Sequence, residues 1–226
     1  MTDISPHIHL PKGGLGLAII NAVSLKMDIE CCDGTKTWQQ QFGLGKTVTP
    51  VTWQLTANAN PYTKVTTQLD PEIFEGHTPD FQAIHQTLFE TAHFYPGLKF
   101  SFDQEIYYEQ KGLKALAEYM LSPIKTNQRQ FYYHAQHEYL DLHLALMGET
   151  KNQSQIKSWV NGTATPEHGS HVQGLLTALT KLNWQPEVIL IHVIMHNPRF
   201  AGPCRNELVH EPTAQLIENI VLTELK

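Results

Sequence analysis

Cysteine, long apolar runs and positive charge are all scarce in this sequence of 226 residues. The three cysteines, Cys31, Cys32 and Cys204, are an odd number without the spacing of a secreted disulfide framework. Adjacent residues of a strand point to opposite faces, so Cys31 and Cys32 are not expected to bridge each other, and buried thiols are predicted. No apolar run reaches the roughly 18 residues of a membrane span, and no signal peptide is recognisable. These absences predict a cytoplasmic protein.

Positive charge is outweighed by negative charge. The 16 lysines and arginines face 22 aspartates and glutamates, which gives a formal net charge of −6 at pH 7. Because DNA is a polyanion, this balance opposes tight DNA binding by the chain alone. Partners are therefore expected among proteins, and the length allows one or two domains.

Hydrophobic periodicity predicts helices interleaved with mostly antiparallel strands, which is typical of an α+β fold. In residues 138–147, leucines alternate with Asp141, His143 and Ala145, so one face of this strand is predicted to be buried and the other wet. Residues 188–195 form a continuous apolar run that indicates a central strand. Further helices are expected at 15–23, 78–92, 113–120 and 214–225, and further strands at 27–32, 35–42, 64–69, 98–102, 105–110 and 131–136.

Residues 159–179 combine a strand, a loop and a helix in one stretch. The loop is marked by Gly162, Pro166 and Gly169. Ser170, followed three residues later by Gln173, predicts a capping box at the start of the helix. Apolar side chains then recur at helical spacing on one face, namely Val172, Leu175, Leu176 and Leu179.

The same stretch resembles the transducer domain in the B subunits of DNA gyrase and topoisomerase IV. Its match to the family segment F-V-N-N-I-N-T-x-x-G-G-T-H-x-x-G-F rests on Val160, Asn161, Thr165, Gly169, His171 and Gly174. Other segments agree with family motifs in the same order, namely 14–16 with 21–24, then 70–74 (D-P-E-I-F), then 197–202 (N-P-R-F-A-G). The resemblance implies a structural role for Asn161, Thr165, Gly169, His171 and Gly174.

The fold implied by this resemblance has two parts. Residues 1–76 are expected to be a remnant of a GHKL-type ATPase domain, which is an α/β sandwich. Residues 77–226 are expected to form a transducer-like domain of the ribosomal-protein S5 domain 2-like type.

A vestige of the family's phosphate site is predicted at Gly14, Gly16 and Arg205. A helix that begins behind a glycine turn can bind phosphate through its free amides, although the glycines could equally serve close packing. Pro11 stands where the family has the first glycine of its box. The family's Q-T-K loop corresponds to residues 203–205, Pro-Cys-Arg. Arg205 keeps a cation for phosphate, and an ordinary surface arginine is the alternative.

Other parts of the family's chemistry have no counterpart in the sequence. These are the catalytic glutamate, the magnesium-binding asparagine, the adenine-reading Asp-x-Gly-x-Gly loop and the toprim domain. Phosphoryl transfer depends on such groups for positioning and charge stabilisation. No catalytic residue is therefore assigned and no cofactor is expected, with residual binding of ATP and magnesium as the remaining option.

Thirteen histidines raise the question of a metal site, because paired imidazoles bind zinc. An H-x-x-x-H pair converges on a helix, whereas residues 188–195 are predicted to be a strand. No metal site is therefore expected. The close pairs are His7/His9, His134/His137, His168/His171 and His192/His196.

The function implied by the resemblance is that of a truncated gyrase B-like protein without ATPase or DNA-cleavage activity. It would act as a binding or regulatory module linked to DNA topology, with a gyrase-type subunit or a second copy of itself as partner. One alternative is a piece of a split type II topoisomerase whose ATP-binding half docks on an exposed sheet edge. A metal-binding protein is a third hypothesis. A resemblance to histidine kinases rests on residues 14–19 alone and explains no later motif.

Overall fold

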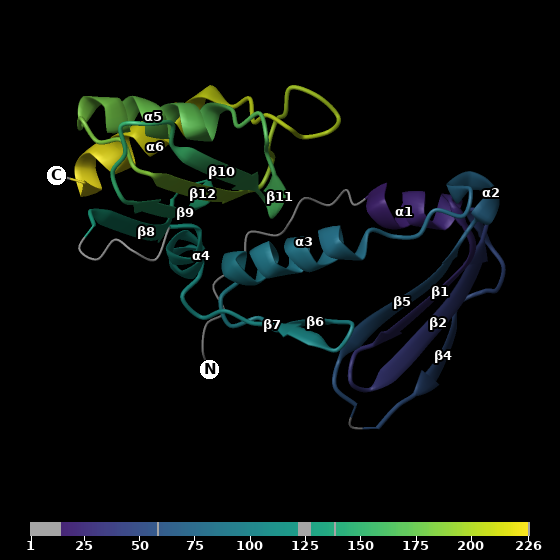
Figure 1. Cartoon of the computed structure of the whole chain (residues 1–226). Helices are drawn as coiled ribbons and strands as arrows, with labels where there is room; N and C mark the ends of the chain where they lie inside the picture. The colour runs from purple at the N-terminus through teal and green to yellow at the C-terminus, as the bar shows by residue number, and fades with distance from the viewer. Residues whose placement is uncertain (1–14, 58, 122–127, 138, 226) are drawn as a thin grey trace. The chain divides into compact units, whose positions relative to one another are not determined.

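The computed structural model describes residues 15–57, 59–121, 128–137 and 139–225 (Figure 1). The chain divides into two compact units, one within Lys12–Asp80 and one within Phe81–Lys226, called the N-terminal unit and the C-terminal unit below. Both combine helices with a mostly antiparallel sheet, which confirms the α+β fold. The helices are α1 (Leu15–Ala22), α2 (Pro71–Phe74), α3 (Phe81–Phe94), α4 (Leu113–Met120), α5 (Ser170–Lys181) and α6 (Glu211–Glu224). The strands are β1 (Ser24–Cys32), β2 (Lys36–Gly43), β3 (Lys46–Thr47), β4 (Thr52–Leu55), β5 (Tyr62–Leu69), β6 (Phe100–Phe102), β7 (Glu105–Tyr107), β8 (Gln130–Gln136), β9 (Leu140–Met147), β10 (Gln155–Val160), β11 (Thr163–Ala164) and β12 (Val188–Met195).

The N-terminal unit is an antiparallel sheet with one short helix against it. Its strand order is β3-β2-β1-β5, and β4 also pairs with β2. Helix α1 is joined to the sheet by the Ser24 hydroxyl, which donates to the Ile20 carbonyl at 2.6 Å. The apolar residues Leu17, Ile19 and Ile20 of this helix are 50%, 58% and 38% exposed. Part of the apolar surface of α1 is therefore uncovered.

Helix α2 closes the N-terminal unit, and its sequence explains its position. Asp70 is the N-cap, and its carboxylate accepts from the Glu72 amide at 2.9 Å. Pro71 fits the first helical position because its missing N–H would have no partner there. The helix ends at Glu75, which is left-handed at φ 48°. The Asp70 amide donates to the Val23 carbonyl at 3.0 Å, so this capped turn is tied to the start of the sheet.

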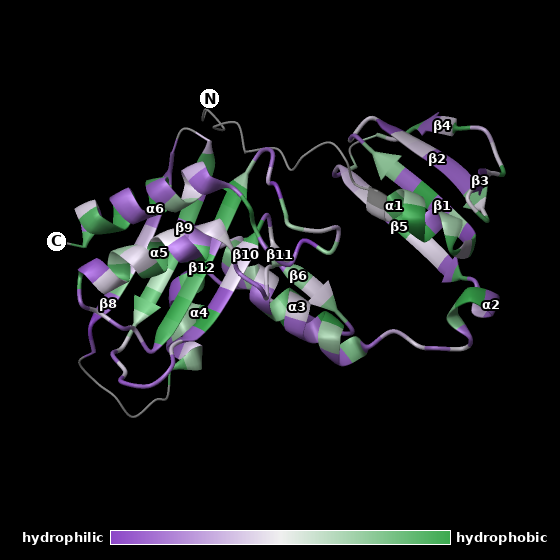
Figure 2. Cartoon of the chain, turned by 90° about the horizontal axis from the view of Figure 1, so that it is seen from above, coloured by the Kyte–Doolittle hydropathy of each residue, from purple (hydrophilic) through white to green (hydrophobic). Residues whose placement is uncertain are grey.

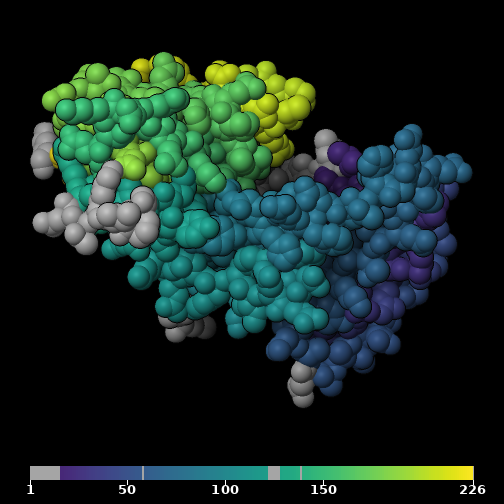
Figure 3. Space-filling view, viewed as in Figure 1, coloured from purple at the N-terminus to yellow at the C-terminus, as the bar shows by residue number. Residues whose placement is uncertain are grey.

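The C-terminal unit places a five-stranded sheet between two layers of helix (Figure 1), and Figure 2 shows α5 and α6 from above, lying over its strands. The strand order is β11-β10-β12-β9-β8, and among its described pairs β10 and β12 alone run parallel. Parallel neighbours need a crossover connection, which α5 supplies between them. Helices α5 and α6 cover one face, and Figure 3 shows residues of α5 in green beside the yellow C-terminal residues on one surface. Helix α4 packs against β9 and β12 on the opposite face.

The alternating leucines of β9 are buried as predicted, but the opposite face of this strand is not simply wet. Ala145 is fully buried, and Asp141 and His143 are half-buried, because α4 and the end of α3 cover this side. The core beneath α5 and α6 includes Leu140, Leu142, Leu144, Leu146, Val160, Leu175, Ile189, Ile191, Val193, Ile217 and Val221. The core on the other side includes Phe94, Leu116, Ala145, Trp159, Val188 and Leu190.

Candidate functional site

The glycine turn can be followed only in part, because Gly14 and Pro11 lie outside the described residues. Gly16 lies in the first turn of α1 and is exposed. A Cβ built at Gly16 would meet nothing within 4 Å, so close packing does not require glycine there. Phosphate binding by this turn stays a prediction.

Arg205 lies in the C-terminal unit, on the exposed segment between β12 and α6. Its backbone is left-handed at φ 58°, and its amide donates to the Gly202 carbonyl at 3.2 Å. The guanidinium carbon lies 5.8 Å from the centre of the Phe200 ring. Cys204 is also exposed, which contradicts the prediction of a buried thiol, whereas Cys32 is buried on β1. Because Gly16 belongs to the other unit, a joint phosphate site of Gly16 and Arg205 stays a prediction.

Asn161 ends β10 and fastens it to the central strand. Its backbone is left-handed at φ 51°, a conformation that asparagine tolerates better than most residues. The side-chain amide donates to the Met195 carbonyl at 2.9 Å, and its oxygen accepts from the Met195 amide at 2.8 Å. One side chain therefore extends the pairing of β10 with β12 beyond the last regular partner, Val193.

Thr165 and His171 belong to a buried polar network under the start of α5. The Thr165 hydroxyl lies 2.8 Å from the Ser158 hydroxyl and 3.4 Å from Nε2 of His171. Ser158 also lies 2.8 Å from Nδ1 of His168, which resembles a serine–histidine pair. This serine is buried and its hydroxyl is shared among several acceptors, so the network holds the loop in place. Burial lowers the pKa of His171 to about 3, which keeps the ring neutral.

Gly169 and Gly174 allow backbones to approach more closely than any side chain permits. A Cβ on Gly169 would lie 2.2 Å from the Leu208 carbonyl oxygen, and the residue is at φ 111°. A Cβ on Gly174 would lie 2.1 Å from the carbonyl oxygen of Ala214, where α5 crosses α6. Both glycines are thus explained by packing.

The predicted capping box at the start of α5 is wrong. Gly169 is the N-cap, and in the described structure no side chain at this position caps the helix by a hydrogen bond. Ser170 instead donates to the Leu208 carbonyl at 3.0 Å and accepts from the His210 amide at 2.7 Å. A tertiary contact with the segment before α6 has replaced the local bond that the S-x-x-Q pattern predicts.

The histidines that are close in the sequence differ in their surroundings. His7 and His9 lie outside the described residues, His192 is buried whereas His196 is exposed, and His168 and His171 both join the network above, through Ser158 and Thr165 respectively. His134 pairs across the hairpin with His143 rather than with His137, and the two rings stack with centres 3.9 Å apart. Asp141 lies between them, 3.1 Å from Nε2 of His134 and 3.5 Å from Nε2 of His143.

The cluster of His134, Asp141 and His143 was not predicted, because its members meet only through the register of β8 and β9. Burial lowers the pKa of His134, and the neighbouring His143 ring lowers the pKa of Asp141. His192 is the next residue along the same row of the sheet, with its ring centre 5.6 Å from that of His143. Its burial lowers its pKa to about 3.

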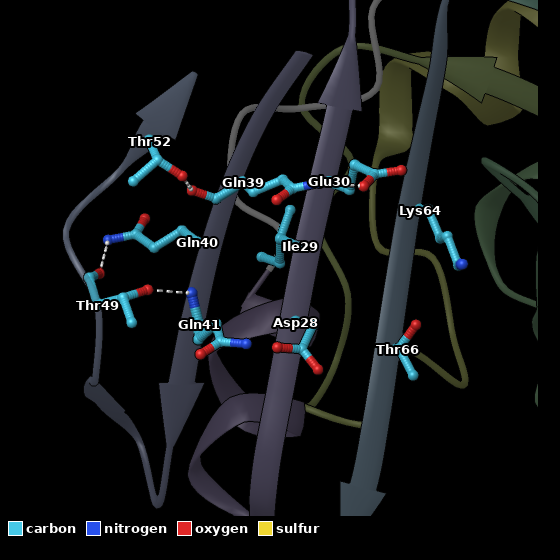
Figure 4. A pocket seen from close by; sticks show the side chains of 10 residues that line it. All are labelled: Asp28, Ile29, Glu30, Gln39, Gln40, Gln41, Thr49, Thr52, Lys64 and Thr66. Carbon is cyan, nitrogen blue, oxygen red and sulfur yellow. Dashed lines mark hydrogen bonds between the residues drawn. The ribbon is translucent and has the colours of Figure 1, made fainter. Parts of the chain in front are cut away.

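A pocket of about 480 Å³ lies on the sheet of the N-terminal unit (Figure 4). Its two carboxylates are already paired, since Glu30 accepts from Tyr62 at 2.6 Å and from Gln39, and Asp28 lies 2.8 Å from Lys26. Small-molecule sites are mostly lined by apolar groups. This lining is mostly polar and belongs to the antiparallel sheet and its connections, namely Asp28, Ile29, Glu30, Gln39, Gln40, Gln41, Thr49, Thr52, Lys64 and Thr66.

The fold of this chain is similar to that of the ATPase regions of type II topoisomerases. It matches the ATP-binding domain of topoisomerase IV from Francisella tularensis with a TM-score of 0.76 at 20% identity, over 95% of this chain and 66% of that one. The 43K ATPase domain of gyrase B from Thermus thermophilus gives a TM-score of 0.72 at 20% identity, over 94% and 66%. No family model matches the chain.

By sequence, the chain is homologous to the B subunits of DNA gyrase and topoisomerase IV. The DNA gyrase B protein of Clostridium acetobutylicum is 26% identical over 92% of this chain and 37% of its own length. The gyrase B protein of Thermotoga maritima is 24% identical over 94% and 39%. The chain thus spans about two fifths of these curated relatives. Among the described helices, none is long and apolar enough to cross a membrane.

Proposed function

We propose that this chain is a gyrase B-like binding module in the cytoplasm, linked to DNA topology through protein contacts and without ATPase or DNA-cleavage activity of its own. The observation that carries the proposal is the open edge of the sheet in the N-terminal unit. An unpaired strand edge offers a row of free amides and carbonyls to another chain. A gyrase-type subunit or a second copy of this chain would supply the pairing strand.

Strand β5 forms this edge. It pairs with β1 from Ser24 to Cys32, and within the described part of the chain no strand pairs with its other side. All eight residues of β5 are exposed, including Tyr62, Val65 and Leu69. Exposed apolar residues of α1 lie in the same unit. A full-length edge with apolar side chains is typical of a surface that another protein covers.

Loss of ATP turnover is supported by the residues at the position of the family's phosphate-contacting loop. Pro203 replaces the glutamine and Cys204 the threonine, so only the cation of Arg205 remains. Proline has no side-chain donor for a phosphate oxygen. Positioning and charge stabilisation by several groups at once are what phosphoryl transfer requires.

The same edge also fits a second function, in which this chain is one piece of a split ATP-dependent type II topoisomerase. A partner chain carrying the ATP-binding half would then complete the sheet beside β5. The two functions differ in one respect: the split enzyme gains ATP hydrolysis when the partner is added, and the binding module does not.

The test begins with the purified chain and relaxed or supercoiled DNA, for which no ATP hydrolysis and no DNA cleavage are expected. Turnover at rates typical of gyrase would refute the proposal. Partners are then captured from cells with the wild-type chain and with Val65→Lys on β5. The matched control is Thr52→Lys on β4, an exposed strand of four residues. Partner loss is expected for Val65→Lys alone, since a charged edge discourages strand pairing.

A further inference from the structure

The hairpin of β8 and β9 gathers three groups that bind transition metals. Its register places His134 opposite His143, and Asp141 lies two residues before His143 on the same face of β9. One ligand atom from each of the three side chains lies within 4.8 Å of the other two. None of these residues belongs to the motifs shared with gyrase.

Two of these atoms are buried without a hydrogen-bond partner. Among the residues that the structure describes, Oδ1 of Asp141 and Nε2 of His143 both have this property. Their neighbours are near enough for ion pairs, at 3.1 Å and 3.5 Å, but are not aligned for hydrogen bonds. Buried polar atoms of native proteins are nearly always satisfied, and an ion is one of the ways in which this happens. The orphaned atoms therefore point to a ligand between the three side chains.

The spacing agrees with such an ion. In a tetrahedral zinc site the bonds to nitrogen and oxygen are about 2.0–2.2 Å, so neighbouring ligand atoms lie roughly 3.4 Å apart. Oδ1 of Asp141 lies 3.1 Å from Nε2 of His134, and Oδ2 lies 3.5 Å from Nε2 of His143, so each carboxylate oxygen meets one imidazole at about this spacing. The two rings are stacked with centres 3.9 Å apart, so one ring must turn for both nitrogens to point at the ion. The His134 side chain is 62% exposed and free to do so.

We infer that His134, Asp141 and His143 bind one divalent transition-metal ion of the zinc class. Two neutral imidazoles and one carboxylate suit such an ion, whereas magnesium and calcium require more oxygen ligands. Three protein ligands leave one position for water on the side of His134. The ion joins β8 to β9 and so stabilises the hairpin. This inference is independent of ATP turnover and of the β5 edge.

The neighbouring His192 forms the inner wall of the site. The Gly162 amide donates to its Nε2 at 3.1 Å, so that nitrogen is occupied. Its Nδ1 has no hydrogen-bond partner in the described structure, yet it is not among the atoms that converge. His192 is therefore a buried neighbour of the ion rather than a ligand.

The experiment uses the full chain purified without an affinity tag, stripped with a chelator and titrated with Zn²⁺ by calorimetry. We expect one ion per chain with micromolar or tighter affinity. Co²⁺ should give the visible absorption bands of a tetrahedral site, and excess Mg²⁺ should not displace either ion. A chain that binds no Zn²⁺, or binds it only at millimolar concentration, would overturn the inference.

Variants locate the ion among the thirteen histidines. His134→Gln and Asp141→Asn are each expected to weaken Zn²⁺ binding about 100-fold, and to abolish the gain in melting temperature that Zn²⁺ gives the wild type. His134 is mostly exposed, so His134→Gln keeps the test valid if the Asp141 variant fails to fold. The control is His85→Gln, because His85 also faces a carboxylate, with Nδ1 3.4 Å from Glu105, but lacks a second histidine. Equal loss in His85→Gln, or full binding by His134→Gln, would place the ion elsewhere and refute the site.

Discussion

Replacing Gly174 with alanine sets two effects of known sign against each other. Alanine is favoured over glycine inside a helix by about 1 kcal/mol, so helix propensity predicts a more stable chain. The new Cβ would lie 2.1 Å from the carbonyl oxygen and 2.8 Å from the Cα of Ala214 in α6. Ordinary contacts begin near 3.4 Å, so the backbones of α5 and α6 must separate by more than about 1 Å.

We expect the packing of α5 against α6 to decide whether Gly174→Ala stabilises or destabilises the chain. Backbone atoms cannot rotate away as a flexible side chain can, and the same helices cover the core around Leu175 and Ile217. Overpacking a native core costs typically about 1–3 kcal/mol, and sometimes more. A backbone clash at 2.1 Å belongs at the upper end of this range, about 3 kcal/mol, so after the gain in propensity Gly174→Ala is expected to lower the free energy of unfolding by about 2 kcal/mol.

The assay is urea unfolding followed by circular dichroism, with Gly16→Ala as the matched control. A Cβ on Gly16 in α1 meets nothing within 4 Å, so the same substitution is expected to be neutral or to stabilise by about 0.5–1 kcal/mol. If Gly174→Ala proved as stable as the wild type, the close approach of α5 and α6 would be refuted. A loss of similar size in both variants would mean that packing is not the cause.

Three further measurements test other parts of the structure. Burial lowers the pKa of His171 to about 3, against about 6.5 in the unfolded chain. Between these two pH values only the unfolded chain binds a proton at His171. The contribution of neutral His171 to the free energy of unfolding is therefore complete above pH 6.5. It is lost as the pH falls towards 3, by at most about 1.4 kcal/mol per pH unit. Urea midpoints measured against pH should show a smaller slope for His171→Gln. Asn161→Ala should cost about 2–3 kcal/mol in urea unfolding, since it removes two hydrogen bonds to Met195 and leaves alanine at φ 51°, and Asn161→Gly should recover part of this loss. A thiol reagent should modify Cys204 in the folded chain and Cys32 only after unfolding; rapid modification of Cys32 would contradict its burial.

Elements with a strong local signal were predictable from the sequence. The apolar run 188–195 is strand β12, Val188–Met195, and the predicted helix 113–120 is α4, Leu113–Met120. Helix α3 runs from Phe81 to Phe94, whereas 78–92 was predicted. Strands β3 and β4 and helix α2 were missed, since two to four residues carry too little periodicity to be recognised.

Contacts set by tertiary structure could not be predicted in the same way. The alternation in 138–147 gives the faces of β9 but not its register against β8, and that register alone brings His134 to His143. Ser170 shows the same limit, because its partner Leu208 lies 38 residues away in sequence. The resemblance to gyrase did single out Gly169 and Gly174, although the close approaches that require glycine became visible only in the structure.

The strand order of the C-terminal unit has a consequence for how the chain folds as it is made. β12 is the last of the described strands in sequence but occupies the middle of the sheet, between β9 and β10. Until Val188–Met195 has left the ribosome, the β8–β9 hairpin and the β10–β11 pair have no common partner, and each exposes a strand edge. The sheet is therefore completed by inserting its centre, which makes folding dependent on contacts between distant residues and slower than for a sheet built from successive hairpins.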